Sequence, residues 1–150
     1  MKLMNNAAAV IVFGLLAIPS AFAYGSRGNC NAGSLQGSFV FTLTGSRTDS
    51  NPGARAAVGH LTADGAGNLA GSETQSNNGT IVANVTETGT YNVNSDCSGS
   101  ATLTLNTGDT ITRHFNFEIA NSQWSGGTEE FVAIVTDTGR IETIDFKQKN

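Results

Sequence analysis

Apolar and polar residues alternate along most of the chain from Leu35 onward, in runs separated by short stretches rich in Gly, Asn and Asp. An alternation with a period of two is typical of β-strands that bury one face and expose the other. About eight such runs can be distinguished, and none shows the period of an amphipathic helix. The short stretches between runs favour hairpins, so consecutive strands are expected to pair antiparallel, in up-and-down order.

An open meander of about eight strands would leave one apolar face and two strand edges exposed to water. Closure of the sheet into a barrel buries that face and removes both edges. We therefore predict an all-β domain that forms a single eight-stranded antiparallel up-and-down barrel. A β-sandwich is the alternative, because the same periodicity fits two stacked sheets.

The phase of the alternation predicts which side chains point toward the barrel interior. In two runs this phase places charged residues among apolar ones. The first inward set is Ile81, Ala83, Val85, Glu87, Tyr91 and Val93, with Gly89 as a bend or bulge. The second inward set is Ile111, Arg113, Phe115, Phe117 and Ile119.

A guanidinium and a carboxylate in an apolar interior each carry a heavy desolvation cost unless they are paired. Arg113 and Glu87 therefore either form an internal ion pair or reach water at the rim, or they orient a ligand. Eight-stranded barrels can hold one small ligand in the lumen. On the ligand hypothesis, the candidate binding residues are Arg113, Glu87, Tyr91, His60, Phe115 and Phe117. His60 is included because it shares its phase with Ala56 and Val58, which is compatible with an interior or rim position.

The N-terminus has the features of a secretory signal peptide over residues 1–23. Lys2 supplies the positive charge, residues 7–18 form an apolar segment, and residues 21–23 (Ala-Phe-Ala) form a small-x-small cleavage site. Residues 24–150 would then form the mature β-barrel domain. The sequence predicts a secreted or periplasmic protein without membrane insertion after cleavage.

Two cysteines, Cys30 and Cys97, lie in the predicted mature domain. In an exported protein they are expected to form a disulfide, because neither has a neighbouring base or basic cluster that would suit a reactive thiol. The formal net charge of −4 and the low content of Lys and Arg argue against a nucleic-acid partner, which would require clustered basic residues.

No residue is predicted to be catalytic. The chain has two histidines, His60 and His114, and neither lies in a recognisable nucleophile motif. The segment Asp64–Asn68 lacks the ligand spacing and the closing glutamate of a calcium loop, and its glycines suit a hairpin turn. No zinc-ligand spacing remains once the cysteines are paired. We therefore predict neither a metal nor a cofactor.

Two segments, GHLTADGAGNL at 59–69 and TGTYNVNSDCSG at 88–99, resemble a group of small, largely uncharacterised exported bacterial proteins. These proteins share G-x-x-T-x-D-G-x-G-N and G-T-Y-x-V-N-x-D-C-x-G. The resemblance covers most of the predicted mature chain and implies a calycin-like barrel, with the allene-oxide-cyclase type as one candidate. Its motifs are turns and a cysteine, so it implies no catalytic residue.

Three functions fit the predicted barrel. The first is a non-enzymatic binder of a small apolar or anionic molecule, with a lumen lined by aromatic residues (Phe39, Phe41, Tyr91, Phe115 and Phe117). The second is a surface or protein-interaction module with a packed interior and an exposed apolar or aromatic patch around Trp124. The third is a lyase or cyclase that would need His60 or Glu87 to face an open lumen.

Overall fold

The computed structural model describes residues 29–123 and 127–149 of the chain. The predicted signal peptide, residues 1–23, and Trp124 lie outside the described residues. Within them, no helix has the length and apolar character needed to cross a membrane.

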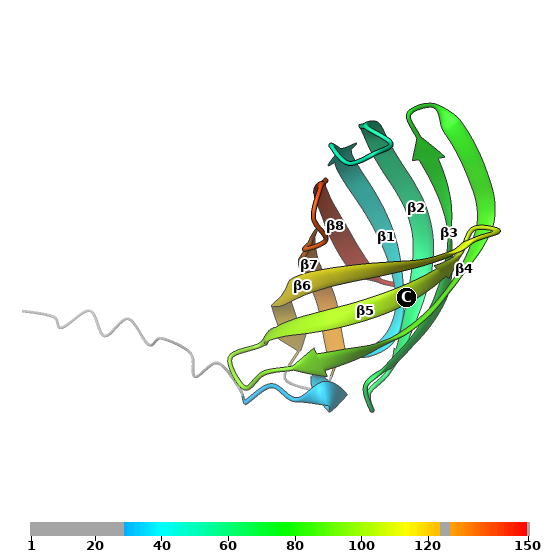
Figure 1. Cartoon of the computed structure of the whole chain (residues 1–150). Helices are drawn as coiled ribbons and strands as arrows, with labels where there is room; N and C mark the ends of the chain where they lie inside the picture. The colour runs from blue at the N-terminus through cyan, green and yellow to red at the C-terminus, as the bar shows by residue number, and fades with distance from the viewer. Residues whose placement is uncertain (1–28, 124–126, 150) are drawn as a thin grey trace, which may run out of the picture.

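The strands form one closed antiparallel sheet, in which each strand pairs with its neighbour in sequence and β8 pairs with β1 (Figure 1). A short 3-10 helix, η1 (Ala32–Ser34), precedes the sheet. The strands are β1 (Gln36–Arg47), β2 (Gly53–Asp64), β3 (Asn68–Asn77), β4 (Thr80–Val93), β5 (Ser98–Asn106), β6 (Thr110–Gln123), β7 (Gly127–Val135) and β8 (Arg140–Gln148). The predicted eight-stranded up-and-down barrel is confirmed, and the sandwich alternative is wrong.

Most inward positions agree with the phase of the alternation. Phe39, Phe41 and Leu43 of β1 are buried, as are Arg113, Phe115 and Phe117 of β6. The residues between them on each strand are exposed. The predicted inward set of β6 is therefore correct.

The first half of β4 departs from its predicted phase. Ile81 is 64% exposed, and Ala83 is also exposed, whereas Val82 packs against the core. The register with β3 shifts here, because Glu73 pairs with Val85 whereas Gln75 pairs with Val82.

Asn84 supplies the extra residue of this bulge, with a φ of 56°. One extra residue reverses the side-chain alternation of everything before it. The bulge predicted at Gly89 is absent, since Gly89 pairs without interruption with Leu69 and Leu103. A Cβ at Gly89 would lie 2.0 Å from the carbonyl oxygen of Thr102, so glycine permits a close approach of β4 and β5.

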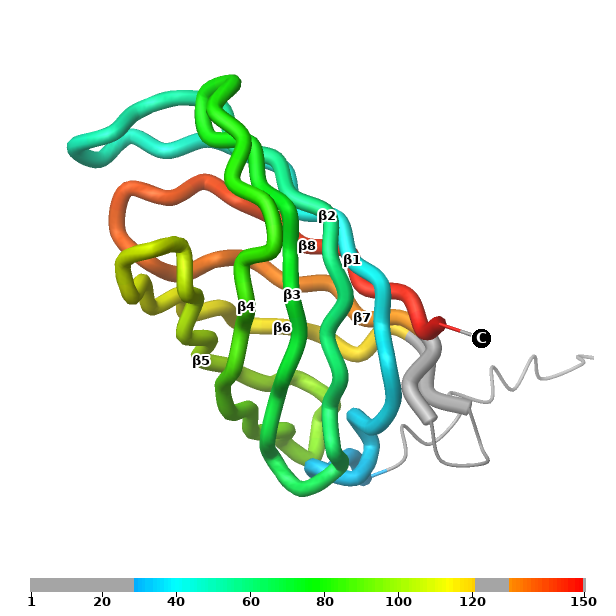
Figure 2. The backbone as a smooth tube through the Cα atoms, turned by 90° about the vertical axis from the view of Figure 1, so that its right-hand side faces the viewer, coloured from blue at the N-terminus to red at the C-terminus, as the bar shows by residue number. Residues whose placement is uncertain are grey.

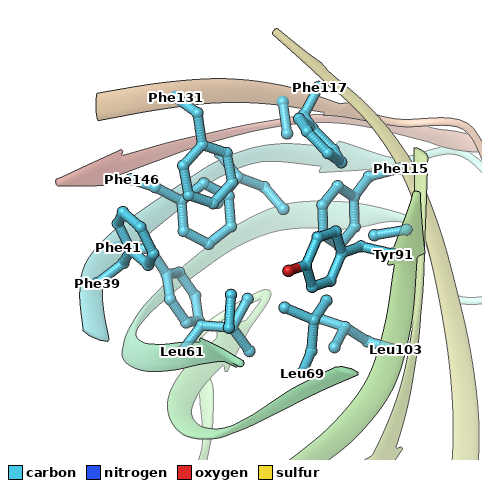
Figure 3. Packing of buried hydrophobic residues seen from close by; sticks show 14 of the residues in the cluster. Phe39, Phe41, Leu61, Leu69, Tyr91, Leu103, Phe115, Phe117, Phe131 and Phe146 are labelled. Atoms are coloured by element: carbon cyan, nitrogen blue, oxygen red, sulfur yellow. The ribbon is translucent and has the colours of Figure 1, made fainter. Parts of the chain in front are cut away.

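One half of the interior is a cluster of aromatic rings (Figure 3). Phe131 and Phe146 stack with ring centroids 4.0 Å apart, and Phe39 meets Phe131 edge-on at 5.1 Å. Phe115 and Phe117 extend the cluster toward β5. These rings are almost completely buried and in mutual contact, so they form a packed core.

The N-terminal segment lies against the end of the barrel formed by the β2–β3 and β4–β5 turns (Figures 1 and 2). The predicted disulfide is confirmed: Cys30 and Cys97 are bonded, with Cα atoms 5.0 Å apart. The Tyr91 hydroxyl lies 2.6 Å from the Leu35 carbonyl oxygen and 2.9 Å from that of Ala32, so it can donate to either. A covalent bond and a buried hydrogen bond thus hold this segment in place.

Candidate functional site

The other half of the interior is polar. Among the residues whose burial the structure describes, six inward side chains there carry charge or an amide, and each is at most 5% exposed: Arg55, Glu73, Gln75, Glu87, Arg113 and Glu142. We call these residues the polar cluster. They belong to β2, β3, β4, β6 and β8, toward the end of the barrel where the β1–β2, β3–β4 and β7–β8 connections lie. We call this end the polar end.

The inner part of the polar cluster is centred on Arg113, which reaches from β6 across the interior to β3. Its two terminal nitrogens donate to the two carboxylate oxygens of Glu73, at 2.9 and 3.1 Å. One of them also lies 3.4 Å from Oε1 of Glu87 on β4. Such a bidentate pair is the strongest form of an arginine–carboxylate contact. Arg113 therefore takes Glu73 as its main partner, and Glu87 is a more distant second one.

Of the two carboxyl groups beside Arg113, that of Glu87 has the weaker contact with the positive charge. Its pKa is raised to about 8, chiefly because burial disfavours the charged form and also because the negative charge of Glu73 lies beside it. Arg113 opposes this shift without cancelling it. One guanidinium balances one carboxylate, so Glu87 holds its proton at pH 7.

The outer part of the polar cluster is centred on Arg55 and Glu142. Arg55 donates to the Gln75 side-chain oxygen at 2.6 Å. Its Nε lies 3.7 Å from Oε1 of Glu142, and Nη1 of Arg140 lies 3.8 Å from the other oxygen. Neither distance is that of a hydrogen bond. The Nε of Arg55 and both carboxylate oxygens of Glu142 are buried without a hydrogen-bond partner.

A glycine lies beside both Arg55 and Glu142 in the sheet. Gly45 of β1 pairs with Arg55 of β2 on one side and with Glu142 of β8 on the other. A Cβ at Gly45 would lie 2.0 Å from the carbonyl oxygen of Ile141. Glycine thus lets the backbones of β1 and β8 approach closely beside these two residues.

The rim of the polar end carries two further arginines. Arg47 is held by Asp49, because its Nε lies 3.0 and 3.1 Å from the two oxygens of that carboxylate and its Nη2 donates to it as well. Arg140 is held loosely, 3.8 Å from Glu142 and 3.9 Å from Asp137.

A small hollow of about 10 Å³ opens at this rim. Its volume suits roughly one water molecule. It is lined by Arg47, Asn51, Gly53, Ala54, Arg55, Asn77 and Asn78. Of these residues, Arg55 belongs to the polar cluster, so the hollow connects that cluster with the solvent-exposed loops.

The structure brings together only some of the candidate ligand residues. Arg113 and Glu87 lie in the polar cluster, and Phe115 and Phe117 lie in the aromatic cluster next to it. Tyr91 is four residues beyond Glu87 on β4, about 13 Å along the strand, and its hydroxyl serves the N-terminal segment. The ligand-binding role of these residues stays a prediction.

The interior or rim position expected for His60 is wrong. His60 is exposed on the outer face of β2, together with Ala56 and Val58, because the inward phase of β2 belongs to Arg55, Ala57 and Leu61. His114 is also on the outer face and pairs with Asp137 at 2.7 Å.

Sequence reasoning missed four members of the polar cluster, namely Arg55, Glu73, Gln75 and Glu142. For two of them, the alternation in phase with apolar residues that placed Arg113 on an inward position was also present. Glu142 shares its phase with Ile144 and Phe146, and Arg55 shares its phase with Ala57.

The outer face of the barrel is concave over two groups of strands. A groove of about 670 Å³ crosses β5–β8, where the exposed side chains of Val132 and Ile134 lie among Ser, Thr and Asn residues. A second groove, of about 480 Å³, includes Val40 and Val58 and lies over β1, β2 and β8. These grooves are the apolar concavities that a surface-interaction function would use.

No protein-family model matches the chain, and searches of curated proteins and of solved structures likewise gave no match.

Proposed function

We propose that the protein is an exported, non-enzymatic binder of a small anionic molecule, which it takes up at the polar end of the barrel. The observation that carries this proposal is the set of unpartnered buried atoms on Arg55 and Glu142. An isolated buried donor or acceptor costs free energy comparable to a lost hydrogen bond, so native proteins pair most of them. A bound molecule with hydrogen-bonding groups would pair these atoms.

The aromatic half of the interior is a poorer candidate for ligand binding. Its rings already contact one another, as the stacking of Phe131 on Phe146 illustrates. An apolar ligand would have to displace packed side chains, whereas a polar ligand at the rim would meet unsatisfied groups. This comparison favours the anionic ligand over the apolar one.

A lyase or cyclase has weaker support. Glu87 has the raised pKa that a general acid requires. Its side chain is nevertheless only 1% exposed, with Arg113 against it, and both histidines lie on the outer face. A substrate would reach the polar end more easily than it would reach Glu87.

A surface-interaction module is the second candidate, and the groove over β5–β8 favours it. Exposed Val132 and Ile134 give that groove an apolar floor, which a partner surface could cover.

Export and family membership belong to the same proposal. The Cys30–Cys97 disulfide supports export, because such bonds persist in oxidising compartments. The closed barrel supports a calycin-like relationship, and the turn and cysteine motifs described above are its basis in sequence.

Titration calorimetry tests the binding proposal on protein exported to a bacterial periplasm, so that the disulfide forms. Formate, acetate, glycolate, lactate and succinate serve as probes. We expect saturable binding of at least one of them, weakened about tenfold or more by Arg55→Gln, since charge-assisted hydrogen bonds are lost.

Lys149→Gln is the matched control, because it removes one positive charge from an exposed residue at the opposite end of the barrel, outside the hollow. This variant should bind within about twofold of the wild type. No binding of any probe, or equal losses in the two variants, would refute the proposal and leave the surface-interaction function as the better candidate.

A further inference from the structure

We infer that the ligand of the polar end is a small hydroxycarboxylate, whose carboxylate is held by Arg55 and Arg140 and whose hydroxyl donates a hydrogen bond to Glu142. This inference rests on the proposed function and narrows it from anions in general to one chemical class. It assigns Glu142 as the residue that determines specificity.

The local charges favour a monoanion. Glu142 lies between two guanidinium groups, 3.7 Å from Arg55 and 3.8 Å from Arg140. Asp137 is also 3.9 Å from Arg140, but it is partly exposed and accepts hydrogen bonds from His114. Among the groups whose side chains are at most 9% exposed, Arg55 and Arg140 carry two positive charges and Glu142 carries one negative charge. A second carboxylate would balance them.

The unsatisfied atoms require a ligand that both accepts and donates hydrogen bonds. The Nε of Arg55 needs an acceptor, which a carboxylate provides. Both oxygens of Glu142 need donors, which a simple carboxylate lacks. A hydroxyl on the neighbouring carbon supplies a donor at short range. A hydroxycarboxylate thus pairs with the Nε of Arg55 and with one oxygen of Glu142 at once.

The size of the rim hollow limits the ligand. Its volume of about 10 Å³ beside Arg55 suits one water molecule, so even a small acid binds only if the hollow widens. Asn51 and Asn78 border the hollow from two connecting loops, which are the elements best able to yield. Acids of two or three carbons are the natural probes.

Glycolate and acetate form a matched pair, because they differ by one hydroxyl group. Calorimetric titration of the wild type should show glycolate binding at least about tenfold more tightly than acetate, as expected for a hydrogen bond to a charged, desolvated acceptor. Equal affinities for the two acids would overturn the hydroxycarboxylate inference and leave the proposed function standing. Failure of every carboxylate to bind would refute the proposed function itself.

The variant Glu142→Gln separates recognition from a structural role. Loss of its charge should strengthen acetate binding, because the repulsion between carboxylates is relieved, and should reduce the preference for glycolate to within about threefold. A purely structural role would instead weaken both acids equally, and that result would overturn the assignment. Lys149→Gln serves again as the control and should retain the wild-type preference.

A measurement on the wild type keeps the inference testable if Glu142→Gln does not fold. In proton–nitrogen correlation spectra, glycolate should shift the Nε–H resonance of Arg55. Calorimetric binding of glycolate without a shift at Arg55 would place the ligand elsewhere and overturn the inference.

Discussion

Arg113 on β6 donates two hydrogen bonds to Glu73 on β3, three strands away around the closed sheet. Both side chains are almost completely buried, so the pair braces the barrel interior from one wall to another. Loss of Arg113 should therefore lower the free energy of unfolding more than loss of one partner of a surface ion pair would.

We predict that Arg113→Ala lowers the free energy of unfolding by about 3–5 kcal/mol at pH 7, because it leaves the Glu73 carboxylate buried and unpaired. Urea denaturation followed by circular dichroism measures the change. The double variant Arg113→Met with Glu73→Gln should lose much less, since no buried charge remains uncompensated. Equal losses in the single and double variants would show that packing around Arg113, and not charge pairing, stabilises this region.

Glu87 predicts a specific dependence of stability on pH. Its pKa is about 8 in the folded protein, against a usual value of 4.5. Between these values the folded state keeps a proton that the unfolded state has released, so the contribution of Glu87 to stability falls as the pH rises from 4.5 to 8. The maximum slope for one group is about 1.4 kcal/mol per pH unit. Above pH 8 both states are ionised and no further loss occurs.

The variant Glu87→Gln isolates this contribution, because glutamine cannot ionise. Relative to the wild type, it should gain stability steadily from pH 5 to pH 8 and remain level above that range. Glu118→Gln on the exposed face of β6 is the control for the substitution of a glutamate by glutamine. A constant difference between Glu87→Gln and the wild type would mean that Glu87 is already ionised at neutral pH.

The fold could be predicted from the sequence because each strand carries its own alternation and each hairpin its own turn residues. The same phase argument placed Arg113 and Glu87 on inward positions. It could not give the partner of Arg113, since Glu73 lies on a non-adjacent strand. Contacts across the lumen depend on how the sheet closes, which local periodicity does not encode.

The bulge at Asn84 was missed for a different reason. An asparagine between two apolar residues looks like an ordinary exposed position of a strand, yet Asn84 adopts a φ of 56° and shifts the register. Asparagine is one of the few residues that tolerate this conformation. Local sequence therefore permitted the bulge without requiring it.

This bulge gives a further prediction. Asn84→Gly should preserve the free energy of unfolding to within about 0.5 kcal/mol, because glycine adopts a positive φ readily. Asn84→Val should cost about 1–3 kcal/mol, because a β-branched residue is strained there. Chemical denaturation of the two variants tests the difference. Equal stability of Asn84→Val and the wild type would contradict the bulge geometry.

The disulfide and Tyr91 hold the same N-terminal segment, so their contributions should be coupled. Replacement of both Cys30 and Cys97 by serine should cost about 4 kcal/mol on the chain-entropy model, given their separation of 67 residues. Tyr91→Phe should cost about 1 kcal/mol in the disulfide-bonded protein, through loss of the hydrogen bond to Leu35 or Ala32. Without the disulfide the segment detaches more easily, and Tyr91→Phe should then cost less. A double-mutant cycle measured by urea denaturation gives the coupling directly. Strict additivity would mean that the segment stays docked on the barrel without its covalent link.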